Sequence, residues 1–167
     1  MGSRKGRDSK YGDLADYLEF LTRSYGDLDD PKWFFVREAM DRNPYSELFR
    51  ELSSLGAVID DTDINCDVCF TFTIQSEQYL TVRLSMVGPY AVVFASGSDG
   101  HGPLRLLETA SQYGTTSEAL IIDIVSRHNL KILSERELRR RIPIRLREGT
   151  PDSSLYAAFF EPDSEAF

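Results

Sequence analysis

Apolar residues in the first third of the chain recur at helical spacing and predict three helices. The first follows Asp13, a capping residue, and carries its apolar residues on one face from Leu14 to Tyr25. Gly26 stands directly after it, where a left-handed C-terminal cap favours glycine. Asp30-Pro31 and Asn43-Pro44 each place a capping side chain before a proline, which costs no hydrogen bond in the first helical turn. We therefore expect the second and third helices to begin at these two pairs.

From Cys66 to Ala95 the pattern changes to an alternation of apolar and polar residues, which is typical of β-strands. The even positions from Cys66 to Ile74 are apolar, and the run from Leu80 to Met86 repeats the alternation. Gly88-Pro89 then turns the chain into a third run, Tyr90 to Ala95. The pattern predicts an antiparallel meander with one apolar and one polar face, and amphipathic helices have to cover the apolar face.

The second half of the chain is predicted to add three helices and two strands. A short helix from about Leu104 precedes a longer amphipathic helix that is capped near Thr115. Lys131 to Leu133 is expected as a short strand, and the capping-box sequence Ser134 to Glu137 is expected to start another short helix. The apolar and aromatic run Leu155 to Phe160 is expected to form a final strand that closes the sheet.

Together these elements predict an α+β fold with N-terminal helices, an antiparallel β-meander, a covering amphipathic helix and a C-terminal strand. A chain of 167 residues is long enough for one domain with a substantial core, and no internal repeat divides it. We expect residues 1–10 to be disordered or derived from expression, and residues 11–167 to form a single domain.

The charge of the chain is acidic and unevenly distributed. The formal net charge is −8, and residues 11–130 hold eight Lys and Arg against nineteen Asp and Glu. A negative field repels phosphate backbones, so a nucleic-acid partner is not expected. The same field would steer a basic protein partner toward this one, although solubility alone also explains an acidic surface.

The hydrophobic pattern and the cysteine count also bear on the cellular compartment of the protein. No apolar run approaches the roughly 18 residues of a membrane span, and the basic N-terminus lacks the apolar core of a signal peptide. Two cysteines are too few for the disulfide framework of a small secreted domain. We expect a cytoplasmic protein without a membrane partner.

The stretch CDVCFTFTI contains the only C-x-x-C pair of the chain. In a strand, Cys66 and Cys69 would lie roughly 10 Å apart and point to opposite faces, too far for a disulfide or a shared metal ion. Redox C-x-x-C pairs begin a helix, whereas the pattern here is that of a strand. Both cysteines are therefore expected to be structural, and we expect no metal and no cofactor.

The acidic stretch before the meander imitates the first half of a calcium loop. Asp61, Asp63, Asn65 and Asp67 alternate as EF-hand ligands do, but the sixth position is Cys66 instead of glycine and the twelfth is not a glutamate. The sequence therefore predicts an exposed acidic turn, which suits a contact with another protein.

The loop from Ser96 to His101 supplies serine, aspartate and histidine, the residue types of a hydrolase. A catalytic triad is defined by its geometry, and residues this close in sequence rarely achieve it. A small hydrolase or transferase that uses this loop remains one alternative.

The C-terminal third contains two segments that resemble known proteins. LKILSERELRRRIPIRL followed by SSLYAAFFEPD resembles the end of small α+β immunity proteins of bacterial polymorphic-toxin systems. The resemblance covers about the last 50 residues and implies a stoichiometric inhibitor without catalysis. Such a protein binds a cognate toxin and blocks its active site, and the acidic charge suggests that this toxin is basic. An adaptor or chaperone for a secreted effector, which would also be small and acidic, is the other alternative.

The residues expected to contact the partner are exposed carboxylates in turns at the ends of the meander. Loops on a rigid sheet are common places for contacts, because their side chains are free of core packing. The oligomeric state is left open. The predicted contact residues are Asp60, Asp61, Asp63, Glu77 and Asp99.

Overall fold

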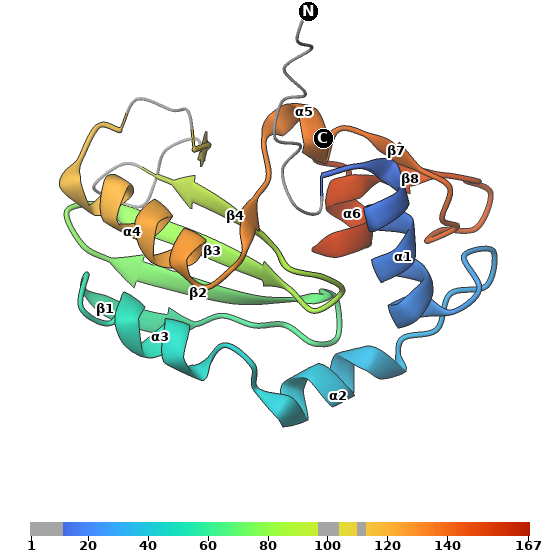
Figure 1. The fold of residues 1–167 in the computed structure, drawn as a ribbon, viewed down its shortest axis with the longest axis horizontal. Helices are drawn as coiled ribbons and strands as arrows, with labels where there is room; N and C mark the ends of the chain where they lie inside the picture. Colours follow the sequence, from blue (N-terminus) through green and yellow to red (C-terminus); the bar gives the residue numbers. More distant parts are fainter. Residues whose placement is uncertain (1–11, 97–103, 110–112) are drawn as a thin grey trace, which may run out of the picture.

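A mixed sheet is the centre of the computed structural model, which describes residues 12–96, 104–109 and 113–167. Within these residues the sheet has six strands, and five of them follow one another in the order β1 to β5 (Figure 1). The sixth, β6, pairs with β4 in parallel, beside β5 on the same edge. The strands are β1 (Ala57–Asp60), β2 (Cys69–Gln75), β3 (Tyr79–Ser85), β4 (Tyr90–Ala95), β5 (Arg105–Leu107) and β6 (Lys131–Ile132).

The predicted meander is confirmed, and its register follows the alternation. Phe70 pairs with Leu84 and Phe72 with Val82, so the apolar side chains of β2 and β3 share one face. The helices α3 (Ser46–Leu52) and α4 (Thr116–Arg127) cover this face (Figure 1). Phe49 of α3 contacts Phe72 with ring centroids 5.0 Å apart. The α+β class and the covering helix are therefore as expected.

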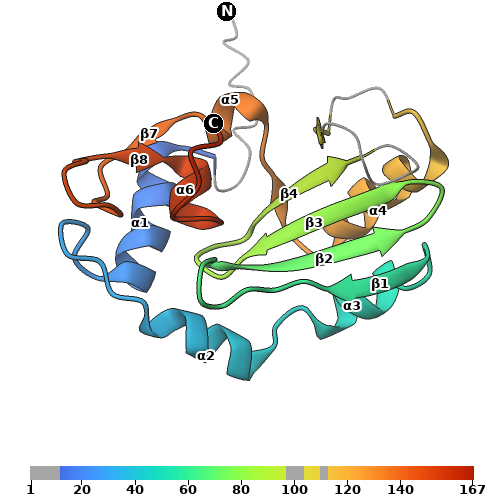
Figure 2. The same cartoon turned by 180° about the vertical axis from the view of Figure 1, so that it is seen from behind.

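A second group of elements packs at one end of the sheet (Figure 2). Its core is aromatic, because the Tyr90 ring lies 5.0 Å from that of Phe159 and 5.4 Å from that of Tyr17. Ser85 of β3 donates to the Phe159 carbonyl oxygen at 2.7 Å, which ties the two groups together. The elements of this group are α1 (Leu14–Tyr25), α2 (Phe34–Arg42), α5 (Glu135–Leu138), β7 (Arg141–Ile142), β8 (Ser153–Ser154) and α6 (Leu155–Phe159).

Three predicted N-terminal helix caps, at Asp13, Thr115 and Ser134, are confirmed by their hydrogen bonds. The side chain of Asp13 accepts from Asp16 N in a capping box, and Gly26 ends α1 with a positive φ of 75°. Thr115 caps α4, and Ser134 forms a second capping box at α5. These caps are local interactions within four residues, so the sequence pattern alone was sufficient to find them.

The predicted starts of the second and third helices were wrong. α2 is preceded by Trp33, because Asp30 pairs with Lys32 in the turn that follows α1 instead of capping a helix. Asn43 ends α2 in the left-handed conformation, with φ 44°, and does not begin α3. A proline directly after a C-terminal cap is as natural as one at a helix start, so Asn43-Pro44 fits both readings.

The predicted C-terminal strand was also wrong, since Leu155–Phe159 form the helix α6. The Ser154 hydroxyl accepts from Ala157 N at 3.0 Å and caps this helix. Residues 153–160 are all buried, so neither a strand nor a helix period is visible in the sequence. The two alanines and the serine cap favour the helix.

Two further elements differ from expectation. The segment at Leu104, expected to be helical, leads into the strand β5, because Leu106 and Leu107 pair with Phe94 and Val93 of β4. β1 was not predicted, and it forms the outer edge of the sheet beside β2. The predicted strand at Lys131 is confirmed as β6, and its parallel pairing makes the sheet mixed.

The cysteines are free, but their surroundings differ from those expected. Cys66 lies before β2 in a turn and is exposed, whereas Cys69 begins β2. Cys69 stands on the polar face of its strand, as predicted, yet it is fully buried. The C-terminal segment packs over this end of the face, where Val68 N donates to the Phe160 carbonyl oxygen at 2.9 Å.

Candidate protein-binding surface

A pocket of about 270 Å³ opens where α2, the turn before β2 and the C-terminal segment meet. One part of its wall is apolar and aromatic, and another carries carboxylates. We call it the Trp33 pocket. Its lining residues are Trp33, Val36, Ile64, Asn65, Cys66, Asp67, Val68, Leu146, Pro162 and Asp163.

The aromatic wall is held rigidly and remains open to solvent. The Trp33 ring is perpendicular to the ring of Tyr25, with centroids 5.3 Å apart, while 43% of Trp33 is exposed. Ile64 of the pocket lining is 50% exposed, and Phe34, which follows Trp33 in the chain but does not line the pocket, is 79% exposed. Phe35 points into the core instead, because only one face of α2 packs inward. Large apolar side chains clustered at a surface are typical of interaction sites.

The acidic wall comes from two distant parts of the chain. Asp63 shapes the turn, since its side chain accepts from Asn65 N at 3.0 Å and its carbonyl oxygen accepts from Asp67 N at 2.8 Å. Asp67 faces the pocket from the end of this turn, and Asp163 faces it from the C-terminal segment. Within the residues that the structure describes, the Asp163 carboxylate forms no ion pair, so its charge is available to a ligand.

A half-buried polar cluster lies behind Asp67. Arg83 of β3 forms an ion pair with Glu161, and its Nη1 lies 3.8 Å from Oδ2 of Asp67. The Tyr156 hydroxyl donates to Glu161 on the other side. Burial, followed by the nearby charge of Glu161, raises the pKa of Asp67 to about 6, with Arg83 acting in the opposite direction. Asp67 is therefore mostly ionised at pH 7 and mostly neutral at pH 5.

Three of the predicted contact residues lie together on one exposed loop. Asp60, at the end of β1, accepts hydrogen bonds from the backbone N and hydroxyl of Thr62, and Asp61 accepts from the Thr73 hydroxyl at 2.6 Å. Asp63 follows on the same loop and shapes the turn that carries the Asp67 wall of the pocket. We call residues Asp60, Asp61 and Asp63 the acidic loop.

Of the other two predicted residues, Glu77 lies apart from the acidic loop, and Asp99 cannot be placed relative to it. Glu77 is exposed in the turn after Gln75, which pairs with Ala57, whereas Asp60 pairs with Phe72 at the opposite end of β1. Asp99 lies outside the described residues. Among the described residues, Asp60, Asp61 and Asp63 therefore lie together, and Glu77 lies at the other end of β1.

Sequence reasoning missed the apolar part of this surface and Asp163. A signal for Trp33 and Phe34 was present, because three aromatic residues in a row, Trp33 to Phe35, cannot all face one core. No comparable signal marked Asp163, which is brought to Trp33 only by the folding of the C-terminal segment.

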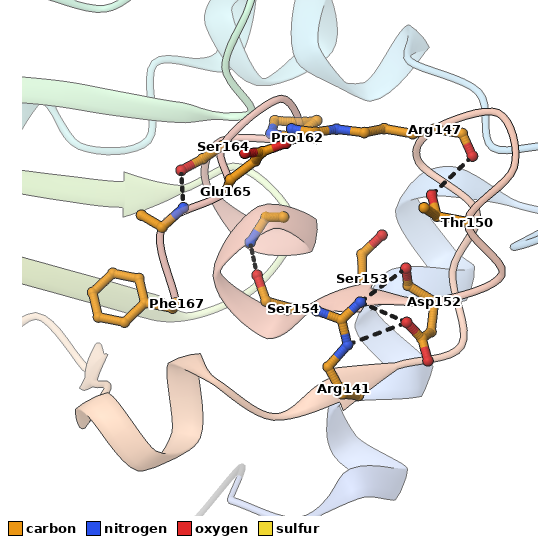
Figure 3. A pocket seen from close by; sticks show the side chains of 12 residues that line it. Arg141, Arg147, Thr150, Asp152, Ser153, Ser154, Pro162, Ser164, Glu165 and Phe167 are labelled. Carbon is orange, nitrogen blue, oxygen red and sulfur yellow. Dashed lines mark hydrogen bonds and ion pairs between the residues drawn. The ribbon is translucent and has the colours of Figure 1, made fainter.

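A second pocket, of about 220 Å³, lies between the β7–β8 hairpin and the C-terminal residues (Figure 3). Its polar groups are largely engaged within the protein: Arg141 is paired with Asp152, and Arg147 with Glu165. The Ser153 hydroxyl donates to the Ile144 carbonyl oxygen, and Ser154 caps α6. This pocket therefore presents less uncompensated charge than the Trp33 pocket.

The alternative catalytic loop is described only at its start. Ser96 is buried and its hydroxyl donates to the Tyr79 carbonyl oxygen at 3.2 Å, while residues 97–101 lie outside the described ranges. In those ranges no three His, Cys, Asp or Glu side chains are grouped so as to hold a metal ion. None of the described helices has the length and apolar character needed to cross a membrane.

Comparison of the chain with known proteins identifies no related protein. No protein-family model matches the chain, and neither a curated protein nor a solved structure is detectably similar to it.

Proposed function

We propose that this protein is an immunity protein that binds a basic cognate toxin domain and blocks its active site, acting in the bacterial cytoplasm without catalysis. The observation that carries the proposal is the surface formed by the Trp33 pocket and the acidic loop. It combines a half-exposed tryptophan in a pocket with carboxylates around it.

This composition is that of a protein interface. Tryptophan is among the residues that contribute most binding energy when it sits in a pocket at the centre of a contact. Carboxylates at the rim add electrostatic complementarity, which raises the association rate with a basic partner. The acidic middle region of the chain, where Asp and Glu outnumber Lys and Arg, would extend this effect.

The surface is also preorganised for binding. Trp33 packs against Tyr25, whose own hydroxyl donates to the Ala158 carbonyl oxygen at 2.6 Å. The acidic loop is held by hydrogen bonds to Thr62 and Thr73. Side chains that are already ordered lose less entropy when a partner binds.

The experiment is to identify the gene next to this one, to express its product as the candidate toxin, and to measure binding and protection. Wild-type protein should bind it in a one-to-one complex and restore the growth of cells that produce it. Trp33→Ala should weaken binding at least tenfold. Leu120→Ala is the matched control, because Leu120 is equally exposed, at 44%, and belongs to α4, a helix that lies apart from α2 (Figure 1).

Other outcomes would change the conclusion. Binding without protection of growth would exclude an immunity function. Binding of an extended effector segment instead of a folded domain would favour the adaptor or chaperone alternative. Equal effects of Trp33→Ala and Leu120→Ala would remove this surface from the interface.

A further inference from the structure

We infer that the Trp33 pocket receives a single arginine side chain of the protein partner, so that the guanidinium stacks on Trp33 and pairs with Asp67 and Asp163. This inference rests on the proposed function and specifies how the partner is recognised.

The size of the pocket favours one side chain over a larger ligand. Its volume is about 270 Å³. Pockets that enclose drug-sized molecules or cofactors usually measure about 300–1,000 Å³. A pocket just below that range suits a long side chain that enters from the surface of a partner.

The chemistry of the walls matches the two parts of an arginine side chain. Val36, Val68 and Leu146 offer apolar contacts to its methylene groups. The exposed indole of Trp33 offers the aromatic face on which a planar guanidinium stacks. The carboxylates of Asp67 and Asp163 are acceptors for its N–H groups.

The charges around the pocket favour a cation over an anion. Two guanidiniums are nearby. Arg83 is paired with Glu161 and lies 3.8 Å from Asp67, and Arg147 is paired with Glu165 and donates to the Asp163 carbonyl oxygen. Asp63, Asp67 and Asp163 add three further carboxylates, which these two cations do not fully offset. The N-terminus of α2 contributes at most about half a positive charge, which is less than a single carboxylate.

The pocket contains two built-in reporters of occupancy. Trp33 is the only tryptophan of the chain, so its fluorescence and its indole N–H resonance report on this site alone. Cys66 also lines the pocket and is exposed, whereas the only other cysteine, Cys69, is buried. Its rate of alkylation is therefore a second readout.

The experiment is a titration of the whole protein with Nα-acetyl-arginine amide at millimolar concentrations, followed by NMR and fluorescence. Nα-acetyl-citrulline amide, which has nearly the same shape without the charge, is the matched probe. Arginine amide should shift the Trp33 indole resonance in a saturable manner and slow the alkylation of Cys66 by iodoacetamide. Citrulline amide at the same concentrations should do neither.

Variants then assign the contacts. Asp163→Asn should weaken the binding of arginine amide severalfold, and Glu77→Gln, at the opposite end of β1, should leave it unchanged. Asp163 is a surface residue, so the fold should persist, which the remaining amide resonances will show. Binding should also weaken severalfold between pH 7 and pH 5, because Asp67 loses its charge in this range.

The possible outcomes distinguish failure of the arginine-binding inference from failure of the proposed immunity function. If arginine amide leaves the indole resonance unchanged, or if citrulline amide shifts it equally, the inference is wrong even where the toxin still binds. If an acidic probe such as Nα-acetyl-glutamate amide binds better, the charge argument is wrong. If arginine amide binds but no toxin does, the pocket stands and the proposed immunity function fails.

Discussion

Tyr25 connects Trp33, in the proposed binding surface, to Ala158 of the C-terminal helix α6. Its ring is perpendicular to that of Trp33, with centroids 5.3 Å apart, and its hydroxyl donates to the Ala158 carbonyl oxygen at 2.6 Å. The Trp33 ring and the Ala158 carbonyl group are thus both contacted by one buried side chain of α1. A change at Tyr25 is therefore expected to affect both the position of Trp33 and the stability of the core.

Tyr25→Phe should keep the ring contact with Trp33 and lose the hydrogen bond. A buried carbonyl left without its donor costs about 1–3 kcal/mol, which urea denaturation will measure. Tyr113→Phe is the control, because the Tyr113 hydroxyl also donates to backbone carbonyl oxygens but is only half-buried. Equal losses in the two variants would show that burial of the Tyr25 bond adds nothing.

Phe72→Ala should be strongly destabilising, by about 3–5 kcal/mol, because it leaves a cavity between β2 and α3. Phe72 is 3% exposed and contacts Phe49. Phe34→Ala removes the same group from a side chain that is 79% exposed and should change the free energy of unfolding by less than about 0.5 kcal/mol. A loss below about 1 kcal/mol for Phe72→Ala would contradict the packing.

Asp67 should make the protein less stable as the pH rises. Its pKa in the folded state, about 6, lies above the ordinary 3.8, so the folded state binds more protons between these values and its stability falls with increasing pH. This rise in the pKa of Asp67 corresponds to at most about 3 kcal/mol of folding free energy. Replacing Asp67 also removes its contact with Arg83, so the variant gains less stability than this. Relative to wild type, Asp67→Asn should gain about 1–2 kcal/mol between pH 4 and pH 7. A difference that does not change with pH would contradict this, since the other carboxylates titrate in both proteins.

The two thiols should differ sharply in reactivity. Burial raises the pKa of the Cys69 thiol to about 12, while Cys66 is exposed and a hydrogen bond to Asp63 raises its pKa less strongly. A thiol reagent at pH 8.5 should therefore titrate one thiol in the native protein and two after unfolding. Cys69→Ser should leave partner binding intact. Two fast-reacting thiols in the native state would show that the C-terminal segment does not cover Cys69.

The acidic loop should act on the rate of association. Changing Asp60, Asp61 and Asp63 to asparagine together keeps acceptors for the turn hydrogen bonds and removes three charges. Association with the basic toxin should slow severalfold at low salt and much less at high salt, whereas dissociation should change little. Surface plasmon resonance at two salt concentrations measures both rates. An unchanged association rate would remove the loop from the interface.

Local patterns in the sequence were sufficient for much of the fold. The alternation through Phe70 and Phe72 identified the meander, because side chains on a strand alternate between a covered and an open face. The caps at Asp13, Thr115 and Ser134 were readable because each one involves residues only three apart. The acidic loop was also visible, as neighbouring carboxylates before a strand.

Two elements could not be predicted from local patterns, for different reasons. Residues 155–160 show no period because every side chain is buried, so the choice between strand and helix depended on the packing of α6 against its neighbours. β1 has only four residues, most of them exposed, and its pairing with β2 is what makes it a strand.

The proposed binding surface depends on the tertiary structure. Its acidic turn is local, but Trp33 and Asp163 are 130 positions apart in the chain and meet only because the C-terminal segment returns to the start of β2. The Val68–Phe160 hydrogen bond and the Arg83–Glu161 ion pair hold it there. The sequence by itself determined which carboxylates are exposed candidates for the proposed contact with a basic partner. Long-range packing decided which of them share one pocket, because contacts between distant segments leave no periodic trace in the order of the residues.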